Sequence, residues 1–264
     1  MNIIELNKKV ELEIAKTSEA ATYLWEREWA ERNGGNISLN ITDIVGELPS
    51  SFEGFRYVQQ SGFPVESAGT VYFVSGTGER LRELTKPDVA GCIIRIDEKV
   101  QGFHILWGGD NSPDFRPTSE FISHLKIHLD KVDSGSDHRS VIHTHPIEMI
   151  CLSHKAEFHR DEEAYNFAMW QMITEVRFFV PKGVGLIPYT MPGSEDLADL
   201  TVETLRKRDI ALWSKHGVVA TGKDALEAFD FIDVANKGVK MYLQCLTSGY
   251  EPVGLTKEEM DGLF

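Results

Sequence analysis

Apolar residues recur at helical spacing through the first 31 residues of the chain, with lysine and glutamate between them. This pattern predicts one or two helices over residues 3–31. The pattern ends at residues 33–36 (NGGN), where two glycines and two asparagines favour turns. Residues 37–41 then alternate as a strand does. Residues 45–69, which are rich in proline, serine and glycine, are expected to form a long surface excursion.

The rest of the chain alternates between short β-branched or aromatic runs and longer amphipathic ones. Strands are predicted at 71–75, 92–97, 103–107, 140–145, 176–180 and 210–213. Helices are predicted at 119–131, 161–174, 194–208 and 224–246. Because strands and helices interleave without a linker or repeat between them, the sequence indicates one α/β domain over residues 1–264.

Composition narrows the class of protein further. A chain of 264 residues with 42% hydrophobic residues can bury a substantial core. No apolar run approaches the roughly 20 residues that cross a bilayer, and the N-terminus lacks the apolar stretch of a signal peptide. Cys92, Cys151 and Cys245 lie far apart in an odd, sparse set. Reduced thiols and a cytoplasmic location are therefore expected.

The formal charge of −14 argues against two classes of partner. Nucleic acid and anionic membranes both require a basic face, so neither is expected to bind this chain. A small phosphorylated substrate remains compatible with the charge, because a few local donors suffice to hold it.

Two histidines, His143 and His145, stand two positions apart on a predicted strand. Residues i and i+2 of a strand project to one face, about 7 Å apart at Cα, so both imidazoles can converge on one ion. A hydrogen-bonded histidine pair at a strand end is the alternative that this spacing leaves open. His216 follows the strand predicted at 210–213 and precedes Gly217, where α/β proteins often place chemistry. Three imidazoles with an open fourth position are typical of a catalytic zinc site.

The other histidines form a weaker pattern. His124 and His128 are one helical turn apart and could chelate an ion, but this spacing also suits one face of any helix, the interpretation that we favour. The remaining histidines have no partner in the sequence that singles them out: His104, His138, His154 and His159.

Two carboxylates are candidates for acid–base chemistry. Glu120 stands just before a predicted helix, where Thr118 or Ser119 would cap and an acid complements the helix dipole. A general base beside the metal is the other interpretation of Glu120, and spacing alone does not choose between them. Glu175 is predicted at the end of the helix that starts near Asp161. A carboxylate is mildly unfavourable at the C-terminal end of a helix, which weakly indicates a functional rather than a structural role.

Two glycine-rich turns could hold an anion. Residues 75–78 (SGTG) follow a predicted strand and offer backbone N–H groups and two hydroxyls. They lack the ending of a nucleotide P-loop and the spacing of a dinucleotide fingerprint. Residues 33–36 could supply amide donors to the same anion, although either stretch alone is often only a turn.

Taken together, these stretches resemble the class II aldolase/adducin family. The resemblance rests on an ordered set that spans most of the chain: ERNGGN (31–36), FVSGTGERLR (73–82), GFHILWG (102–108), PTSE (117–120), VIHTHP (141–146), TE (174–175), GVGLIPYTMPGSED (183–196) and LWSKHGV (212–218). GFHILWG and ERNGGN point within the family to members that act on L-rhamnulose 1-phosphate rather than on fuculose or ribulose phosphates.

This resemblance implies an activity and a set of residues for it. The activity is reversible, metal-dependent cleavage of L-rhamnulose 1-phosphate to dihydroxyacetone phosphate and L-lactaldehyde. His143, His145 and His216 would bind one zinc ion per subunit, with Glu120 as the catalytic acid/base and a fourth ligand before substrate arrives. Residues implied around the phosphate and the dihydroxyacetone moiety are Asn33, Asn36, Gly76, Thr77 and Ser119. Glu175 would be a second acid presented across a subunit boundary.

The resemblance also implies a fold and an assembly. The expected fold is three-layer α/β, with a mixed, largely antiparallel sheet flanked by helices, assembled as a cyclic homotetramer with interfacial active sites. One departure is that this chain has Ser75-Gly76-Thr77-Gly78-Glu79 where close relatives have Thr-Gly-Ser-Gly-Lys, so a lysine is replaced by Glu79. If that lysine matters for the phosphate, affinity here would be weaker or supplied differently.

Three other functions within this family remain possible from the sequence, two enzymatic and one structural. A pentulose-phosphate 4-epimerase shares the metal site but needs a different second acid/base. A dehydratase of a methylthio-sugar phosphate is a second enzymatic alternative. Adducin-like members keep the fold as a cytoskeletal binding module, and the three histidines argue against that class because those members lack them.

Overall fold

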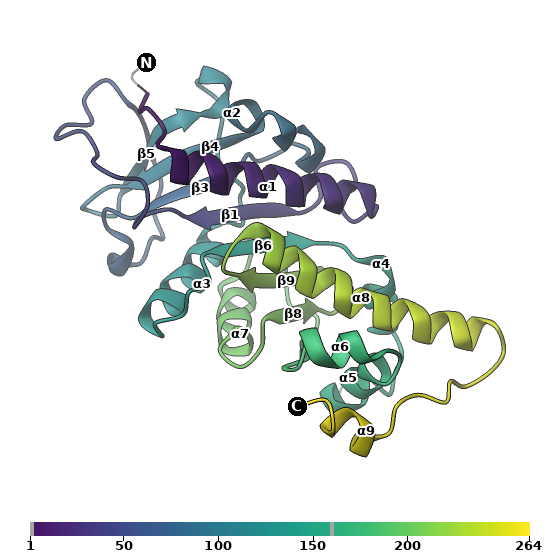
Figure 1. Ribbon diagram of the computed structural model, residues 1–264. Coiled ribbons are helices and arrows are strands. Elements are labelled where there is room, and N and C mark those ends of the chain that lie inside the picture. Colours follow the sequence, from purple (N-terminus) through teal and green to yellow (C-terminus); the bar gives the residue numbers. More distant parts are fainter. Residues whose placement is uncertain (1–2, 159–160) are drawn as a thin grey trace.

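One mixed sheet of nine strands forms the middle layer of the molecule in a computed structural model, which describes residues 3–158 and 161–264 (Figure 1). The strand order is β2-β5-β4-β3-β1-β6-β9-β8-β7. Neighbouring strands are antiparallel except for the parallel pair β7 and β8. The strands are β1 (Asn36–Asn40), β2 (Arg56–Gln59), β3 (Val71–Ser75), β4 (Gly91–Ile96), β5 (Gly102–Gly108), β6 (Ser140–Thr144), β7 (Val184–Ile187), β8 (Ile210–Trp213) and β9 (Gly217–Gly222).

Helices cover both faces of this sheet. Figure 1 shows α1 and α8 lying in front of the sheet, and α3 and α7 pack together against the other face. The helices are α1 (Lys8–Glu26), α2 (Pro87–Ala90), α3 (Phe121–Asp133), α4 (Ile147–Leu152), α5 (Glu162–Trp170), α6 (Thr174–Phe179), α7 (Glu195–Leu205), α8 (Ala225–Thr247) and α9 (Lys257–Asp261). The expected three-layer fold with a largely antiparallel sheet is confirmed.

Side-chain alternation along the strands divides the core between the two faces. On β1, Ile37 and Leu39 are fully buried in the large cluster that includes α1 and α8. Ser38 points to the opposite face, where it contacts two histidines of α3. On β3, Tyr72 and Val74 likewise pack toward α3 in a second cluster. The nine strands of the described residues form a single sheet, and one domain over residues 1–264 stays a prediction.

One predicted strand is wrong. Residues 176–180 (VRFFV), which are rich in β-formers, lie mostly in helix α6, and the neighbouring strand is β7, further along the chain. In α6, Val176 is fully buried and the helix packs on α8, so tertiary packing overrides a weak local preference. The helix predicted over 161–174 is also shorter, because α5 ends at Trp170. Strand β9 was not predicted, and neither was β2, which lies within the stretch 45–69 that was expected to be a surface excursion.

The ends of five strands meet at one edge of the sheet. Asn36, the first residue of β1, pairs with His143 near the end of β6. Ser38 pairs with Val74 of β3, so β3 also ends at this edge. Strands β8 and β9 are joined there by a tight turn that carries His216. Four strand connections and the start of α3 therefore surround one small volume.

Candidate metal centre and active site

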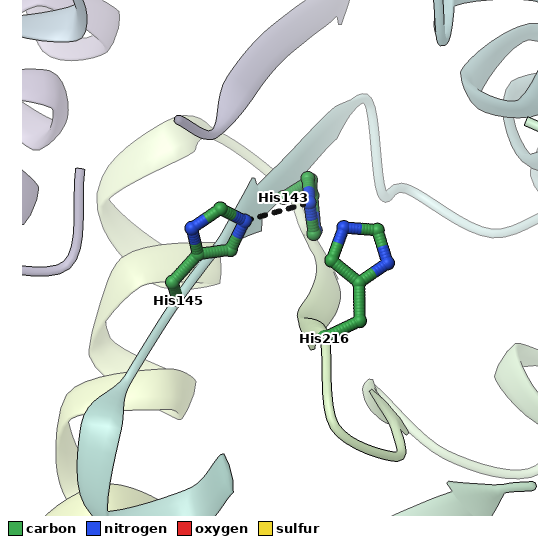
Figure 2. Close-up of side chains that lie close together, drawn as sticks. All are labelled: His143, His145 and His216. Atoms are coloured by element: carbon green, nitrogen blue, oxygen red, sulfur yellow. Dashed lines mark hydrogen bonds between the residues drawn. The ribbon is translucent and has the colours of Figure 1, made fainter. Parts of the chain in front are cut away.

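His143, His145 and His216 converge as the sequence predicts. One ligand atom from each ring lies within 4.8 Å of the other two. Figure 2 shows the three rings gathered around one point, His143 on β6, His145 just beyond it and His216 from the turn between β8 and β9. His145 follows the last residue of β6 rather than lying within it. Among the residues that the structure describes, this is the one group of three or more such side chains that could hold a metal ion.

The second ring nitrogens set the chemistry of the first two ligands. His143 Nδ1 lies 2.9 Å from the carbonyl oxygen of Val218, and His145 Nδ1 lies 2.7 Å from a Glu31 carboxylate oxygen. Because these oxygens only accept, both Nδ1 atoms carry protons and donate. The two Nε2 atoms face each other at 3.3 Å.

This arrangement requires a cation or a proton between the two Nε2 atoms. His143 Nε2 has a lone pair, so it must face a cation or an N–H donor. A further proton on His145 satisfies only this one pair. A metal ion satisfies all three rings, and a ligating histidine that donates its other nitrogen to a carbonyl or carboxylate is the usual pattern at metal sites. The donor set thus fits a divalent ion such as zinc.

Burial keeps two of the rings in the form that binds metal. Desolvation lowers the pKa of His143 well below 6.5, and the neighbouring His145 and His216 lower it further. Desolvation also lowers the pKa of His216, against an opposing effect of Glu120. The Trp213 ring covers both, with centroids 4.6 Å from His143 and 5.1 Å from His216. Neutral imidazole is the metal-binding form at neutral pH.

Glu120 reaches the metal centre from the start of α3. Its carboxylate oxygen lies 3.9 Å from His143 Nε2 and accepts a 2.6 Å hydrogen bond from the side-chain amide of Asn36. Neither Thr118 nor Ser119 caps α3 through its side chain, and Glu120 occupies the cap position without a side-chain cap bond. The carboxylate therefore faces the site instead of the helix end.

A small polar pocket of about 200 Å³ adjoins this centre. It contains every predicted site residue except Glu175, and its walls are Asn33, Gly34, Gly35, Asn36, Gly76, Thr77, Gly78, Thr118, Ser119, Glu120, His143, His145 and His216. Within the described chain, no hydrogen bond involves the side chains of Asn33, Thr77 and Ser119, which are exposed to the pocket. The buried Oδ1 of Asn36 also has no partner there. These groups are free to bind a polar ligand.

The SGTG turn differs from its predicted use. The N–H groups of Gly76 and Thr77 donate to the carbonyls of Ala90 and Arg116, both at 2.8 Å. These two N–H groups are therefore already paired, whereas within the described chain no hydrogen bond is made by the Gly78 N–H or the Thr77 hydroxyl. At Gly76 an added Cβ would lie 2.5 Å from the Phe115 ring, so glycine is required for this close approach.

Glu175 lies elsewhere, exposed in the first turn of α6. The helix predicted to end there, α5, ends at Trp170, and Glu175 instead lies near the start of α6, so the argument from an unfavourable helix end is wrong. Hydrogen bonds from its own backbone N–H and from the Thr174 hydroxyl lower the pKa of Glu175. It does not line the pocket of its own chain.

The other histidines that the structure describes do not join the metal centre. His124 and His128 are buried and both lie 2.8 Å from the Ser38 hydroxyl, which fits a helix face rather than a chelate. His138 contacts Thr221, and His104 stacks on Phe52. His159 lies outside the described residues.

Sequence analysis missed several parts of the site. Glu31 belongs to the ERNGGN run and Trp213 to the LWSKHGV run, but no role was assigned to them, and Gly34 was considered only as an amide donor to an anion. Their signal is indirect, because each acts through contact with a histidine ring. Gly217 is a further example: a Cβ there would lie 2.9 Å from the His143 ring and 2.8 Å from that of His145.

Comparison with known proteins gives consistent relatives over nearly the full chain. A rhamnulose-1-phosphate aldolase of Bacteroides thetaiotaomicron is 38% identical over 98% of this chain and 95% of its own length. One from Klebsiella pneumoniae is 31% identical over 95% and 89%. The crystal structure of a sugar-phosphate aldolase from Thermotoga maritima has a TM-score of 0.78 at 30% identity, covering 92% of this chain and 99% of that one.

The family itself is also identified directly. The family model described as "Class II Aldolase and Adducin N-terminal domain" matches residues 15–243. In the described part of the chain, no helix has both the length and the apolar character to cross a membrane. With a family match over most of its length and relatives above 30% identity across nearly all of it, this chain belongs to the class II aldolase/adducin family.

Proposed function

We propose that this chain is a zinc-dependent class II aldolase, a lyase, that reversibly cleaves L-rhamnulose 1-phosphate to dihydroxyacetone phosphate and L-lactaldehyde. The observation that carries the proposal is the convergence of three histidines, Glu120 and three partnerless polar side chains on one pocket. The full-length relatives named rhamnulose-1-phosphate aldolase support this substrate. The reaction belongs to the breakdown of L-rhamnose, for which we propose a cytoplasmic location.

His143, His145 and His216 would hold the metal through ring nitrogens that face one another. When bound, the ion supplies Lewis-acid stabilisation of the negative charge that develops as the C3–C4 bond breaks, a contribution on the order of several kcal/mol. The protein supplies neutral imidazoles in fixed positions for this purpose. The lower pKa of His143 keeps that ring available without competition from a proton at neutral pH.

Glu120 is the proposed acid/base. In the cleavage direction it would accept the proton that the C4 hydroxyl loses as the C3–C4 bond breaks and then give a proton to C3 of the dihydroxyacetone phosphate fragment, and in the reverse direction both transfers run backwards. Asn36 donates to the carboxylate at 2.6 Å and so fixes its position beside His143. The free Oδ1 of Asn36 can accept from a substrate hydroxyl, which would orient the substrate and Glu120 together.

The phosphate is proposed to lie against Asn33, Thr77 and Ser119. Their side chains make no hydrogen bond within the described chain, so they can donate to an anion without losing an existing bond. The start of α3 lies beside Ser119, and the positive end of a 13-residue helix favours an anion. Among the described residues that line the pocket there is neither lysine nor arginine, so these neutral donors and the metal would balance the charge.

Glu175 is proposed to act in the site of a neighbouring subunit within a homotetramer. Its absence from the pocket of its own chain supports this arrangement. The surface next to it supports an interface, because Phe178 and Phe179 of α6 are 53% and 54% exposed and Phe264 stacks on Phe178. Large apolar side chains grouped on a surface mark sites of association.

The test combines metal removal with a comparison of substrates. We expect chelation to abolish cleavage of L-rhamnulose 1-phosphate and added zinc to restore it, with metal content measured in each sample. L-fuculose 1-phosphate and ribulose 5-phosphate are the matched alternatives, since an epimerase would act on the latter without cleavage. Full turnover in a sample shown to lack metal, or a clear preference for either alternative, would contradict the proposal.

A further inference from the structure

Glu31 forms a hydrogen bond with His145, one of the proposed metal ligands. A Glu31 carboxylate oxygen lies 2.7 Å from His145 Nδ1. Glu31 is 65% exposed, and no other ion pair or hydrogen bond is recorded for its side chain in the described residues. A surface pair of this kind contributes little to folding stability in water. Its position is therefore better explained by what it does to His145.

The loop after α1 is fastened to the end of β6. The carbonyl of Trp29 accepts from the backbone N–H of His145 at 3.0 Å and from the Thr144 hydroxyl at 2.7 Å. Both bonds fix the loop two residues before Glu31. The loop also contains two non-glycine residues in the left-handed region, Glu28 with φ 64° and Arg32 with φ 49°. Such conformations persist where surrounding contacts hold them.

Gly34 leaves the space in which the pair forms. A Cβ at this position would lie 3.1 Å from the Glu31 carboxylate and 3.1 Å from His145 Cε1, as well as 2.9 Å from the Glu31 carbonyl oxygen. Any larger residue would therefore push the carboxylate and the ring apart. Loop anchoring, backbone conformation and the missing side chain all favour the same contact.

The contact selects one form of His145. Since a carboxylate accepts, Nδ1 carries the proton and Nε2 turns its lone pair toward His143 Nε2, 3.3 Å away. The other two rings have no charged partner on their second nitrogen within the described chain. His143 Nδ1 bonds to a backbone carbonyl, and His216 Nδ1 is buried without a partner. Among the described residues, Glu31 is thus the one carboxylate that accepts a hydrogen bond from the outer nitrogen of a ligand ring.

We propose that Glu31 is a positioning residue of the metal centre, whose carboxylate orients His145 and strengthens its bond to zinc. This inference rests on the proposed function for the identity of the metal. Outer partners of ligating histidines commonly change metal affinity by 10–100-fold. Glu31→Ala removes both the orientation and the charge, whereas Glu31→Gln keeps an acceptor oxygen and removes only the charge.

The test measures zinc affinity directly, by competition with a chromophoric chelator on the full chain. We expect Glu31→Ala to bind zinc about 10–100-fold more weakly than the wild type, with Glu31→Gln between the two. Glu28→Gln is the matched control, because it removes the same charge from an exposed position in the same loop. It should bind zinc as the wild type does. Excess zinc should return most of the turnover number of the Glu31 variants, which a residue that touches substrate would not allow.

Two results would overturn the inference. One is a Glu31→Ala chain whose zinc affinity is within twofold of the wild type. The other is a Glu28→Gln chain that weakens zinc binding as much as Glu31→Gln, since this would reflect loop charge alone. Failure of the proposed function is distinguishable: a wild type that binds zinc without cleaving L-rhamnulose 1-phosphate overturns the activity but not the role of Glu31. A wild type that binds no zinc overturns both.

Discussion

Glu120 shows how one side chain is separated from its local structural role. At the start of α3 a carboxylate usually bonds to the helix end, but here it accepts from Asn36 and lies 3.9 Å from His143 Nε2. The partner comes from the first residue of β1, which pairs directly with His143 across the sheet. Acid, amide and metal ligand are therefore placed by strand register, a relation that no local sequence pattern contains.

Glu120→Gln should retain zinc and lose proton transfer. Glutamine has nearly the same shape and still offers an oxygen to Asn36, so the pocket is preserved while the base is removed. We expect exchange of the C3 proton of dihydroxyacetone phosphate to fall by about 10²–10⁴-fold. Exchange into deuterated water, followed by NMR, measures this step without the aldehyde. Glu83→Gln, a change outside the pocket, is the control, and exchange at the wild-type rate in Glu120→Gln would remove Glu120 from its role.

Gly217→Ala should lower the zinc affinity by displacing the ligand rings. The new Cβ would lie 2.5 Å from the Thr144 carbonyl oxygen and within 2.9 Å of two histidine rings, so the rings or β9 must shift. We expect zinc affinity to fall by about tenfold or more, as for other changes around metal ligands. In Gly262→Ala the nearest atom is 3.5 Å away, and that variant should bind zinc normally. Equal affinities in both variants would show that the ring positions tolerate the shift.

At the scale of elements, α3 and β1 are joined by a buried polar group rather than by apolar packing alone. His124 and His128 each lie 2.8 Å from the Ser38 hydroxyl between them. Desolvation by burial lowers the pKa of His124 to about 4 and that of His128 to about 3. Both rings are therefore neutral in the folded chain over a pH range in which an unfolded histidine becomes charged.

This lowering makes stability dependent on pH in a definite direction. Between the folded values and about 6.5, the unfolded chain binds more protons than the folded chain, so the free energy of unfolding falls as pH falls. Above about pH 6.5 both rings are neutral in the folded and the unfolded chain, so this loss of stability is absent there. Each ring accounts for up to about 1.4 kcal/mol per pH unit within the window. In His128→Gln, whose amide can still bond to Ser38, the slope between pH 4.5 and 6 should be smaller by about this amount. Urea unfolding in chelator at a series of pH values measures it.

The two curves also provide an internal control. Above pH 7 the free energies of unfolding of the wild type and His128→Gln should differ by a constant amount. The reason is that the His128 ring is neutral there in both the folded and the unfolded chain. Equal slopes below pH 6 in the two proteins would mean that His128 is not held neutral by burial.

Elements with one strong period were predictable, and those fixed by distant contacts were not. The amphipathic pattern of α8 and the short β-branched run of β6 are local signals, so both were found within a few residues. The run at 176–180 has β-forming residues but becomes helical on α8, and β9 follows a turn closed by Trp213 and Gly217. In the site, the three histidines stood out by type and spacing. Glu31 did not, because its contact joins residues 114 positions apart.

At the scale of the whole molecule, the pocket is open and one predicted acid is missing from it. Glu175 lies on α6, beside exposed Phe178 and Phe179, while the pocket lies at the edge where β1 and β6 meet. In the homotetramer that we propose, an interface that buries the phenylalanines would also bring Glu175 of one subunit to the pocket of another. This proposal accounts for both the exposed apolar surface and the position of Glu175.

Mixed assemblies of two impaired variants test this arrangement. Glu120→Gln and Glu175→Gln chains with different affinity tags are co-expressed, and assemblies that carry both tags are isolated. If Glu175 acts across a boundary, a site formed by Glu120 of one variant and Glu175 of the other contains both wild-type acids. Random assembly of equal amounts gives about one quarter of sites in this state, so activity should approach about a quarter of the wild-type value per site. If Glu175 acts within its own chain, no site regains both acids and activity stays at the mean of the two variants. Because the two schemes differ in which sites can exist, the outcomes separate clearly when each variant alone retains far less than a quarter of the wild-type activity.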